Sequence, residues 1–363
     1  MSSSPDASLT QDDSFTATSH RGLTYPWGDH APGLGEMTPV ADGVYWVRIP
    51  MPGGLDHINC WVIDAGDNAI ATVDSGMRIA ECRDAWTALF DGPLAGKTLP
   101  TVIATHLHPD HIGLVGWLCE RDGGMLHMTR TEWLTAQYGM ADAQDEVPEA
   151  VSALRRATGW TEEQIETSRK DGWGWMRRYV HRFPHNYRRL RDGDHLRIGA
   201  TEWEVIVGNG HSPEHACLYN RAANVLIAGD QLLPRISSNV SVQANEPMAN
   251  PLADWIASID KLRAALPEDV LVLPAHGEPF RGAHARLDAI RSEHMERLEA
   301  LALWCAEAPR STVDCFPKLF NREIGDRHRG LATGEALAHL RWLEDAGRVT
   351  RDMQGDVWMW RGV

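Results

Sequence analysis

The sequence has few cysteines, and they are not placed where cysteines usually carry structure or chemistry. The six are irregularly spaced, and no two form a C-x-x-C pair. In a chain of 363 residues this excludes a disulfide framework and favours reduced thiols in the cytoplasm. The N-terminus lacks a basic segment followed by an apolar one, and no apolar run approaches the ~18 residues of a membrane span. We therefore expect a cytoplasmic protein that does not enter a membrane.

Positive charge is also in short supply. The chain has 35 Lys and Arg residues against 50 Asp and Glu residues, which gives a formal net charge of −15. A surface of this sign repels phosphate backbones, so nucleic acid is a disfavoured partner and a small molecule is the expected one. Hydrophobic residues make up 43% and charged residues 23%, an ordinary composition for a globular protein with a sizeable core.

The order of local patterns predicts an α/β protein. Short β-rich runs, such as those at 44–49, 58–63 and 69–73, alternate with segments of helical spacing, which favours sheets with helices outside them. Near the C-terminus a helical pattern precedes a two-stranded ribbon, as in a small winged-helix domain. The predicted division is a flexible N-terminal tail over 1–34, a catalytic domain over 35–282 with a helical insertion over 129–191, and a C-terminal domain over 283–363.

The strongest chemical signal is the run His106-Leu-His108-Pro-Asp110-His111. It directly follows an apolar run that we interpret as a buried strand. His106 and His108 are two residues apart at the end of this strand, so their side chains leave the same face. Asp110 and His111 follow at an expected helix start. Imidazole and carboxylate ligands together suit zinc, iron or manganese rather than calcium.

Three further candidate ligands stand at later strand ends. His211 lies in Gly-His-Ser-Pro, Asp230 follows Gly229, and His276 lies in Pro-Ala-His-Gly. Each follows an apolar run and has Gly or Pro beside it, which lets the backbone turn sharply and bring the side chain to a common point. His215 is expected to be structural. His57 and Asn239 are weaker candidates that either face the site or shape a loop.

These motifs, in this order, resemble those of the metallo-β-lactamase superfamily. THLHPDH is similar to its H-x-H-x-D-H signature, and GHSPEH, AGDQ and PAHGEP resemble its later motifs. The resemblance covers most of residues 35–282. It implies an αββα sandwich, in which two mixed sheets are flanked by helices. It also implies that Asp74, in an early Asp-x-Gly turn, supports the ligands without being one.

The resemblance further implies a two-metal centre. His106, His108 and His211 would hold one ion. Asp110, His111 and His276 would hold the second ion, and the carboxylate of Asp230 would bridge the two. The expected cofactors are two divalent ions, zinc ahead of iron or manganese. They would lower the pKa of bound water to ~7 and so provide a bridging hydroxide as the attacking group. Asp110 is the implied catalytic residue, which orients the hydroxide and takes up its proton.

The fold and metals do not decide the substrate. We expect hydrolysis of an ester, thioester or lactone bond, as in hydroxyacylglutathione hydrolases. The alternative is an endoribonuclease or phosphodiesterase, because some relatives of this kind end in a winged helix, although the charge of −15 weighs against it. A mononuclear iron dioxygenase is disfavoured by the complete ligand set, and an exported β-lactamase by the missing leader. The C-terminal domain would pack on the catalytic domain, cover one flank of the site or build a homodimer.

Overall fold

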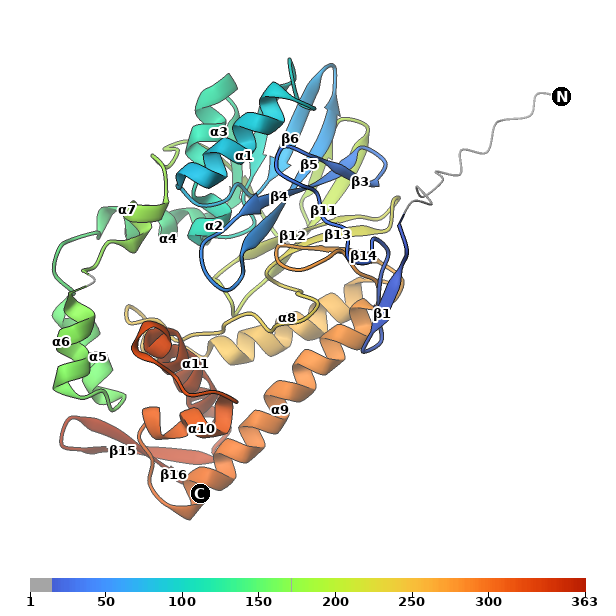
Figure 1. The fold of residues 1–363 in the computed structure, drawn as a ribbon. Coiled ribbons are helices and arrows are strands. Elements are labelled where there is room, and N and C mark those ends of the chain that lie inside the picture. Colours follow the sequence, from blue (N-terminus) through green and yellow to red (C-terminus); the bar gives the residue numbers. More distant parts are fainter. Residues whose placement is uncertain (1–14, 171) are drawn as a thin grey trace.

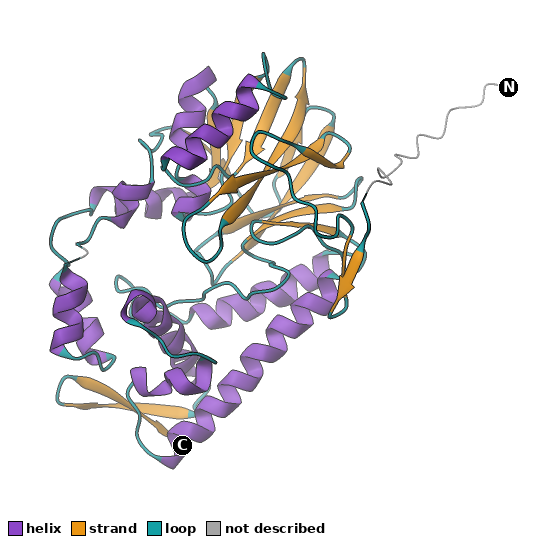
Figure 2. Cartoon of the chain, viewed as in Figure 1, coloured by secondary structure: helices purple, strands orange, loops and turns teal. Residues whose placement is uncertain are grey.

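The computed structural model describes residues 15–170 and 172–363. Two β-sheets stack face to face at its centre, and helices cover their outer faces (Figure 1, Figure 2). The fold is therefore the predicted αββα sandwich. The first sheet has seven strands, in the spatial order of the sequence: β3 (Thr38–Ala41), β4 (Val44–Pro50), β5 (His57–Gly66), β6 (Ala69–Val73), β7 (Thr98–Ile103), β8 (Met125–Thr129) and β9 (Tyr187–Leu190).

The second sheet is also mixed. It contains β10 (His195–Ile198), β11 (Thr201–Gly208), β12 (His215–Asn220), β13 (Val225–Gly229) and β14 (Leu271–Pro274). Its first four strands are antiparallel and β14 runs parallel to β13, while in the first sheet β6 to β9 are parallel. The parallel strands β7, β13 and β14 matter most, because the segments that follow them carry candidate ligands.

Bulky side chains fill the space between the two sheets. Trp46 and Trp61 from the first sheet and Trp203 from the second are almost completely buried there, together with Val73 and Leu218. Burying a large apolar side chain contributes roughly 1.5–3 kcal/mol. This packing holds the strand ends of both sheets in fixed relative positions, on which the site depends.

Helices α1 (Ala80–Asp91) and α3 (Val115–Asp122) cover the first sheet, and a short helix, α2 (Pro109–Ile112), precedes α3. The chain forms the helix start expected at Asp110 and His111 as α2, which is separated from α3 at Gly113. A Cβ atom on Gly113 would lie 2.5 Å from the carbonyl oxygen of Gly76. This close approach needs glycine, and it seats the ligand-bearing turn against the Asp74-Ser75-Gly76 segment.

The described residues of the predicted insertion, 129–170 and 172–191, contain four helices: α4 (Arg130–Ala141), α5 (Glu149–Ala157), α6 (Glu162–Arg169) and α7 (Trp175–Tyr179). Its last residues are not helical as predicted but form β9, which pairs in parallel with β8. Four residues are too few to show a clear alternation against the aromatic-rich helices before them. The insertion reaches the C-terminal domain (Figure 1), where the Trp160 indole N–H donates to Thr333 Oγ1 at 2.9 Å.

Helices α8 (Pro251–Ala265) and α9 (Ala283–Glu307) cover the second sheet. The rest of the C-terminal part contains a 3-10 turn η1 (Val313–Cys315), α10 (Phe316–Leu319), α11 (Asp326–Asp345), β15 (Val349–Gln354) and β16 (Val357–Gly362). A helix followed by a two-stranded ribbon has the order that we predicted. The buried side chains of this C-terminal part join those of α8 and α9 in one continuous apolar core. None of the helices in the described residues combines the length and apolar character of a membrane span.

The predicted flexible tail over 1–34 needs correction. Residues 1–14 lie outside the described part of the chain, but β1 (Thr18–His20) and β2 (Leu23–Tyr25) form a ribbon, and Leu23 and Tyr25 are buried. The polar composition of the first residues does not extend past about residue 21. The apolar residues that follow gain enough from burial to be held against the second sheet and α9.

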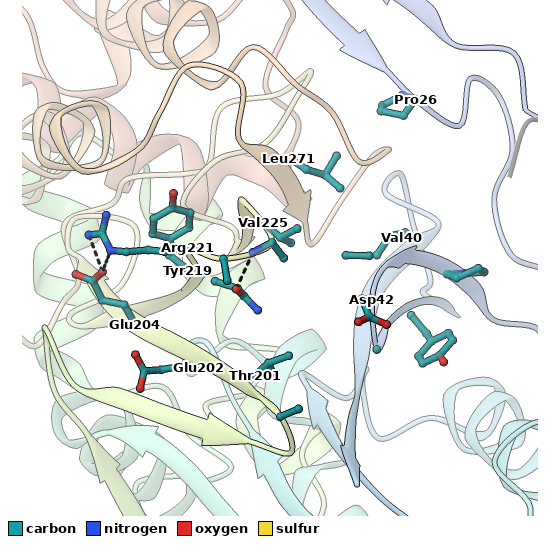
Figure 3. A pocket seen from close by; sticks show the side chains of 18 of the residues that line it. Pro26, Val40, Asp42, Thr201, Glu202, Glu204, Tyr219, Arg221, Val225 and Leu271 are labelled. Carbon is teal, nitrogen blue, oxygen red and sulfur yellow. Dashed lines mark hydrogen bonds and ion pairs between the residues drawn. The ribbon is translucent and has the colours of Figure 1, made fainter. Parts of the chain in front are cut away.

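A cavity of about 940 Å³ opens between the two sheets (Figure 3). Thr201, Val225 and Leu271, which begin β11, β13 and β14, line it. Since the candidate ligands follow the opposite ends of β13 and β14, this cavity is separate from the candidate metal centre.

Candidate metal centre

The candidate ligands gather at one end of the sandwich because each follows the carboxyl end of a buried strand. His106 comes three residues after β7, His211 three residues after β11, Asp230 directly after β13, and His276 two residues after β14. Asp110 and His111 lie in α2, and His108 directly precedes this helix. The structure brings all seven predicted side chains together, in two groups.

Three histidines and one aspartate form the first group. His106 Nε2 lies 2.8 Å from His108 Nδ1 and 3.2 Å from His211 Nε2. Asp230 Oδ2 completes the group at 3.3 Å from His211 Nε2. The four ligand atoms lie within 4.8 Å of one another, close enough to share one ion.

The second group consists of Asp110, His111 and His276. Asp110 Oδ2 lies 3.5 Å from His111 Nε2 and 3.3 Å from His276 Nε2. The other oxygen of the shared aspartate, Asp230 Oδ1, lies 3.5 Å from both imidazole nitrogens. Asp230 thus turns one carboxylate oxygen towards each group, which is the arrangement that a bridging ligand requires.

Two buried polar atoms indicate that this arrangement suits a cation. His111 Nε2 and Asp230 Oδ1 are shielded from solvent and make no hydrogen bond with any described residue. Leaving such atoms unpaired costs about 1–3 kcal/mol each. A divalent ion in each group would engage both. The set of imidazoles and carboxylates suits zinc, iron or manganese.

Hydrogen bonds to the backbone fix which nitrogen two of the histidines present. His211 Nδ1 lies 2.7 Å from the carbonyl oxygen of Asn239, and His276 Nδ1 lies 2.8 Å from that of His57. A carbonyl oxygen only accepts, so each Nδ1 must carry the hydrogen. The Nε2 lone pair of each ring is then directed into the site, as metal ligation requires.

Asp74 supports the site from behind. Its Oδ2 lies 2.8 Å from His111 Nδ1, and its Oδ1 accepts a hydrogen bond from the backbone N–H of Thr105 at 2.8 Å. The Thr105 side chain also contacts two ligands, because its Oγ1 lies 3.1 Å from the Nδ1 atoms of both His106 and His111. Asp74 holds a left-handed φ of 64°, which indicates that the surrounding contacts impose this turn.

Glu132 is a buried carboxylate that the sequence analysis did not identify. It lies on α4, and its two oxygens accept backbone N–H groups from Leu107 at 2.9 Å and from Glu214 at 2.8 Å. Leu107 separates the first two ligands, and Glu214 follows the Gly-His-Ser-Pro loop. One side chain therefore ties two ligand loops together. A single acidic residue in an amphipathic helix gives no pattern that would reveal this role.

His215, which we expected to be structural, supports another ligand. Its Nε2 accepts the backbone N–H of Asp230 at 3.1 Å, and its ring stacks on His106 with 4.8 Å between centroids. Burial holds the pKa of His215 well below its usual range. A neutral ring is what this acceptor role needs.

The two groups differ in charge. Burial lowers the pKa of His108 to about 3 and holds that of His106 well below its usual range, so these two imidazoles of the first group are neutral. Burial alone would also lower the pKa of His111, but the carboxylates of Asp74, Asp110 and Asp230 raise it well above its usual range. Burial would raise the pKa of Asp110, yet the neighbouring imidazoles of the second group lower it to about 2.

This difference predicts stepwise loss of metal on acidification. Protons compete with metal for imidazole nitrogen, and they bind most tightly where the pKa is raised. As the pH falls, His111 and His276 should take up protons before His106 and His108 do, so the second group should release its ion at a higher pH than the first. Equilibrium dialysis followed by elemental analysis checks this. Simultaneous release of both ions would contradict it.

A solved structure and two family models match this chain. Residues 53–277 match the model of the metallo-beta-lactamase superfamily, and residues 298–362 match that of the metallo-beta-lactamase-like C-terminal domain. A beta-lactamase domain protein from Burkholderia ambifaria is 40% identical, with a TM-score of 0.86 over 94% of this chain and 98% of its own. The chain belongs to the metallo-β-lactamase superfamily of metal-dependent hydrolases.

More distant relatives have names that describe an activity. The probable metallo-hydrolase YqjP of Bacillus subtilis is 23% identical over 87% of this chain and 97% of its own length. The acyl-coenzyme A thioesterase MBLAC2 of Gallus gallus is 24% identical over 71% of this chain and 86% of its own length.

Proposed function

We propose that the protein hydrolyses the thioester bond of an acyl-coenzyme A at two divalent ions held by the seven candidate ligands. The observation that carries the proposal is Asp230, which faces one carboxylate oxygen to each ligand group. The name of the Gallus gallus relative supplies the substrate class.

The site's residues suit attack on an acyl carbon. Bound divalent ions would lower the pKa of water to about 7 and polarise the carbonyl oxygen. Asp110 has a low pKa, so at neutral pH its carboxylate is an acceptor that can orient a water O–H. About 14% of this side chain is exposed, so it reaches the open side of the site. Asp74 and Glu132 hold the ligands fixed while the reaction proceeds.

Exposed apolar side chains lie on the segments that border the site. Leu55 precedes His57, Tyr138 lies on α4, and Ile236 and Met248 belong to the loop that follows Asp230. All four are between 38% and 53% exposed. Exposed apolar side chains on segments that carry or adjoin the ligands suit contact with an apolar group. They are compatible with an acyl chain in the substrate.

A basic segment lies close by in this otherwise acidic chain. Residues 169–191 contain eight Lys and Arg residues and one acidic residue. Helix α7, within this segment, packs against α2, and the backbone N–H of His181 donates to the carbonyl oxygen of Gly113 at 2.7 Å. Arg177 and Arg178 are exposed and have no carboxylate partner among the described residues. These guanidinium groups suit the phosphate groups of coenzyme A.

Replacing Arg177 and Arg178 together with alanine should raise KM for an acyl-coenzyme A about tenfold, because phosphate contacts are lost, and should leave kcat unchanged. A pantetheine thioester, which lacks the nucleotide, should react equally with both proteins. Steady-state kinetics with the two substrates checks the prediction. Arg197→Ala, an exposed change on β10, is the matched control. An equal loss on both substrates would contradict a phosphate-binding role.

The test of the function is turnover of metal-loaded protein with substrates that contain different bonds. We expect hydrolysis of the acyl-coenzyme A, slower hydrolysis of a matched oxygen ester or lactone, and no cleavage of RNA. RNA cleavage would instead favour the endoribonuclease, for which the basic segment would also be suited. One iron per chain without hydrolysis of any substrate would overturn the proposal in favour of an oxygenase.

A further inference from the structure

We propose that Glu335, on helix α11 of the C-terminal domain, is a positioning residue for the metal ligand His211 and acts on it through Asn239. The inference rests on the proposed metal centre but not on the proposed substrate. It gives the C-terminal domain a direct part in the site.

The first link joins the ligand to a loop. The Nδ1–H of His211 donates to the carbonyl oxygen of Asn239 at 2.7 Å, and this bond sets both the tautomer and the direction of the ring. Asn239 lies in the long loop between β13 and α8 and has no regular secondary structure around it. Something else must therefore hold its carbonyl group in place.

The second link joins this loop to the C-terminal domain. Asn239 Nδ2 donates to Glu335 Oε2 at 3.0 Å, while the Ser241 hydroxyl donates to Asn239 Oδ1. Both ends of the amide are thus engaged. Glu335 Oε1 lies 3.5 Å from Arg297 Nη1 on α9, so the carboxylate is itself held between two elements. A hydrogen bond to a charged group is stronger than one between neutral groups, so this link can fix the amide of Asn239.

The backbone on either side of this link confirms a close contact between loop and helix. The N–H of Val242 donates to the carbonyl oxygen of Gly334 at 3.1 Å. A Cβ atom on Gly334 would lie 2.7 Å from the side chain of Ser241, so the loop could not approach a helix with a larger residue there. Glycine is less favourable than alanine inside a helix, so the close approach of the loop explains why glycine stands at position 334.

A second anchor from the C-terminal part holds the start of the same loop. Arg286, a buried side chain on α9, donates to the carbonyl oxygens of Leu233 at 2.7 Å and Ile236 at 2.9 Å. This anchor lies before Asn239 and the contact with α11 lies after it. With the flanking backbone held independently, removing the Glu335 carboxylate should disturb the Asn239 link without releasing the whole loop.

The test measures metal affinity rather than activity. In a His276→Ala background, which weakens the second group, zinc binding to the first group is measured by competition with a chromophoric chelator. Glu335→Ala should weaken this binding about tenfold. Asn239→Ala keeps the backbone carbonyl but loses the side-chain link, and should show a similar loss. The double variant should lose no more than either single one, because both remove the same link.

Glu299→Ala is the matched control, because its carboxylate pairs with Arg348 away from the loop. It should bind zinc as the background protein does. Circular dichroism and thermal unfolding show which variants are folded, and Asn239→Ala, which removes the donor of the same link, serves alone if Glu335→Ala does not fold. Wild-type affinity in folded Glu335→Ala, or fully additive losses, would overturn the inference. Absence of zinc binding by the wild-type protein would instead overturn the metal centre itself.

Discussion

Replacing Asp230 with asparagine is expected to lower thioester turnover about 10³-fold, which corresponds to roughly 4 kcal/mol of transition-state stabilisation. Asparagine has nearly the same shape but carries no charge, and it offers one acceptor oxygen where the carboxylate offers two. It can no longer present an anionic oxygen to both ligand groups, as Asp230 does at 3.3 and 3.5 Å. Metal content should fall from two ions to about one.

Elemental analysis and steady-state kinetics on the same preparation check both parts of this result. His108→Ala, which removes a ligand of the first group only, should also abolish most activity and reduce bound metal. Asp29→Asn makes the same chemical change at an exposed position and should have no effect. Full turnover in either ligand variant would show that the two-metal mechanism is wrong.

The second large effect is expected at Glu132. Glu132→Ala leaves the buried backbone N–H groups of Leu107 and Glu214 without their acceptor, at about 1–3 kcal/mol each. The free energy of unfolding should therefore fall by roughly 2–6 kcal/mol. Since these groups belong to two ligand loops, metal affinity should fall about 10–100-fold as well. Denaturant unfolding and chelator competition measure the two quantities.

Glu132 also predicts a pH dependence. Burial raises the pKa of Glu132 from 4.5 to about 7, so the folded protein holds this proton to a higher pH than the unfolded chain. The stability that this proton contributes is complete below pH 4.5 and is lost as the pH rises through about 7. Glu132→Gln cannot titrate there. The unfolding free energy of the metal-free wild type, measured relative to that of Glu132→Gln, should therefore fall as the pH rises over this window. A constant difference between the two proteins would contradict the raised pKa.

The ligand set could be predicted from the sequence because each ligand is tied to a strand end. A buried strand followed by Gly or Pro and one polar residue is a local pattern, and three such patterns follow the run at His106 to define the site. The run from His106 to His111 indicates a metal centre at a strand end, so the remaining ligands are expected at later strand ends. The alternating strand and helix patterns predict sheets with helices outside them, and the resemblance of the motifs implies the αββα sandwich itself.

Most of the residues that hold the ligands could not be predicted in this way. The resemblance implies the role of Asp74, and Asn239 is only a weak candidate in the sequence. Glu132 and Glu335 are single polar residues on helices, and their partners lie 25 to 96 residues away in the chain. Nothing in local spacing distinguishes these two glutamates from solvent-exposed polar residues. The same limit applies to β9, whose four residues become a strand only because β8 offers an open edge.

The most direct test of the central claim is to count metal ions and measure thioester turnover in one preparation, before and after chelation. We expect about two ions per chain and turnover of an acyl-coenzyme A, loss of both on chelation, and recovery of both when zinc is restored. Turnover that survives removal of the metal, or a metal-loaded protein that leaves every thioester intact, would contradict it.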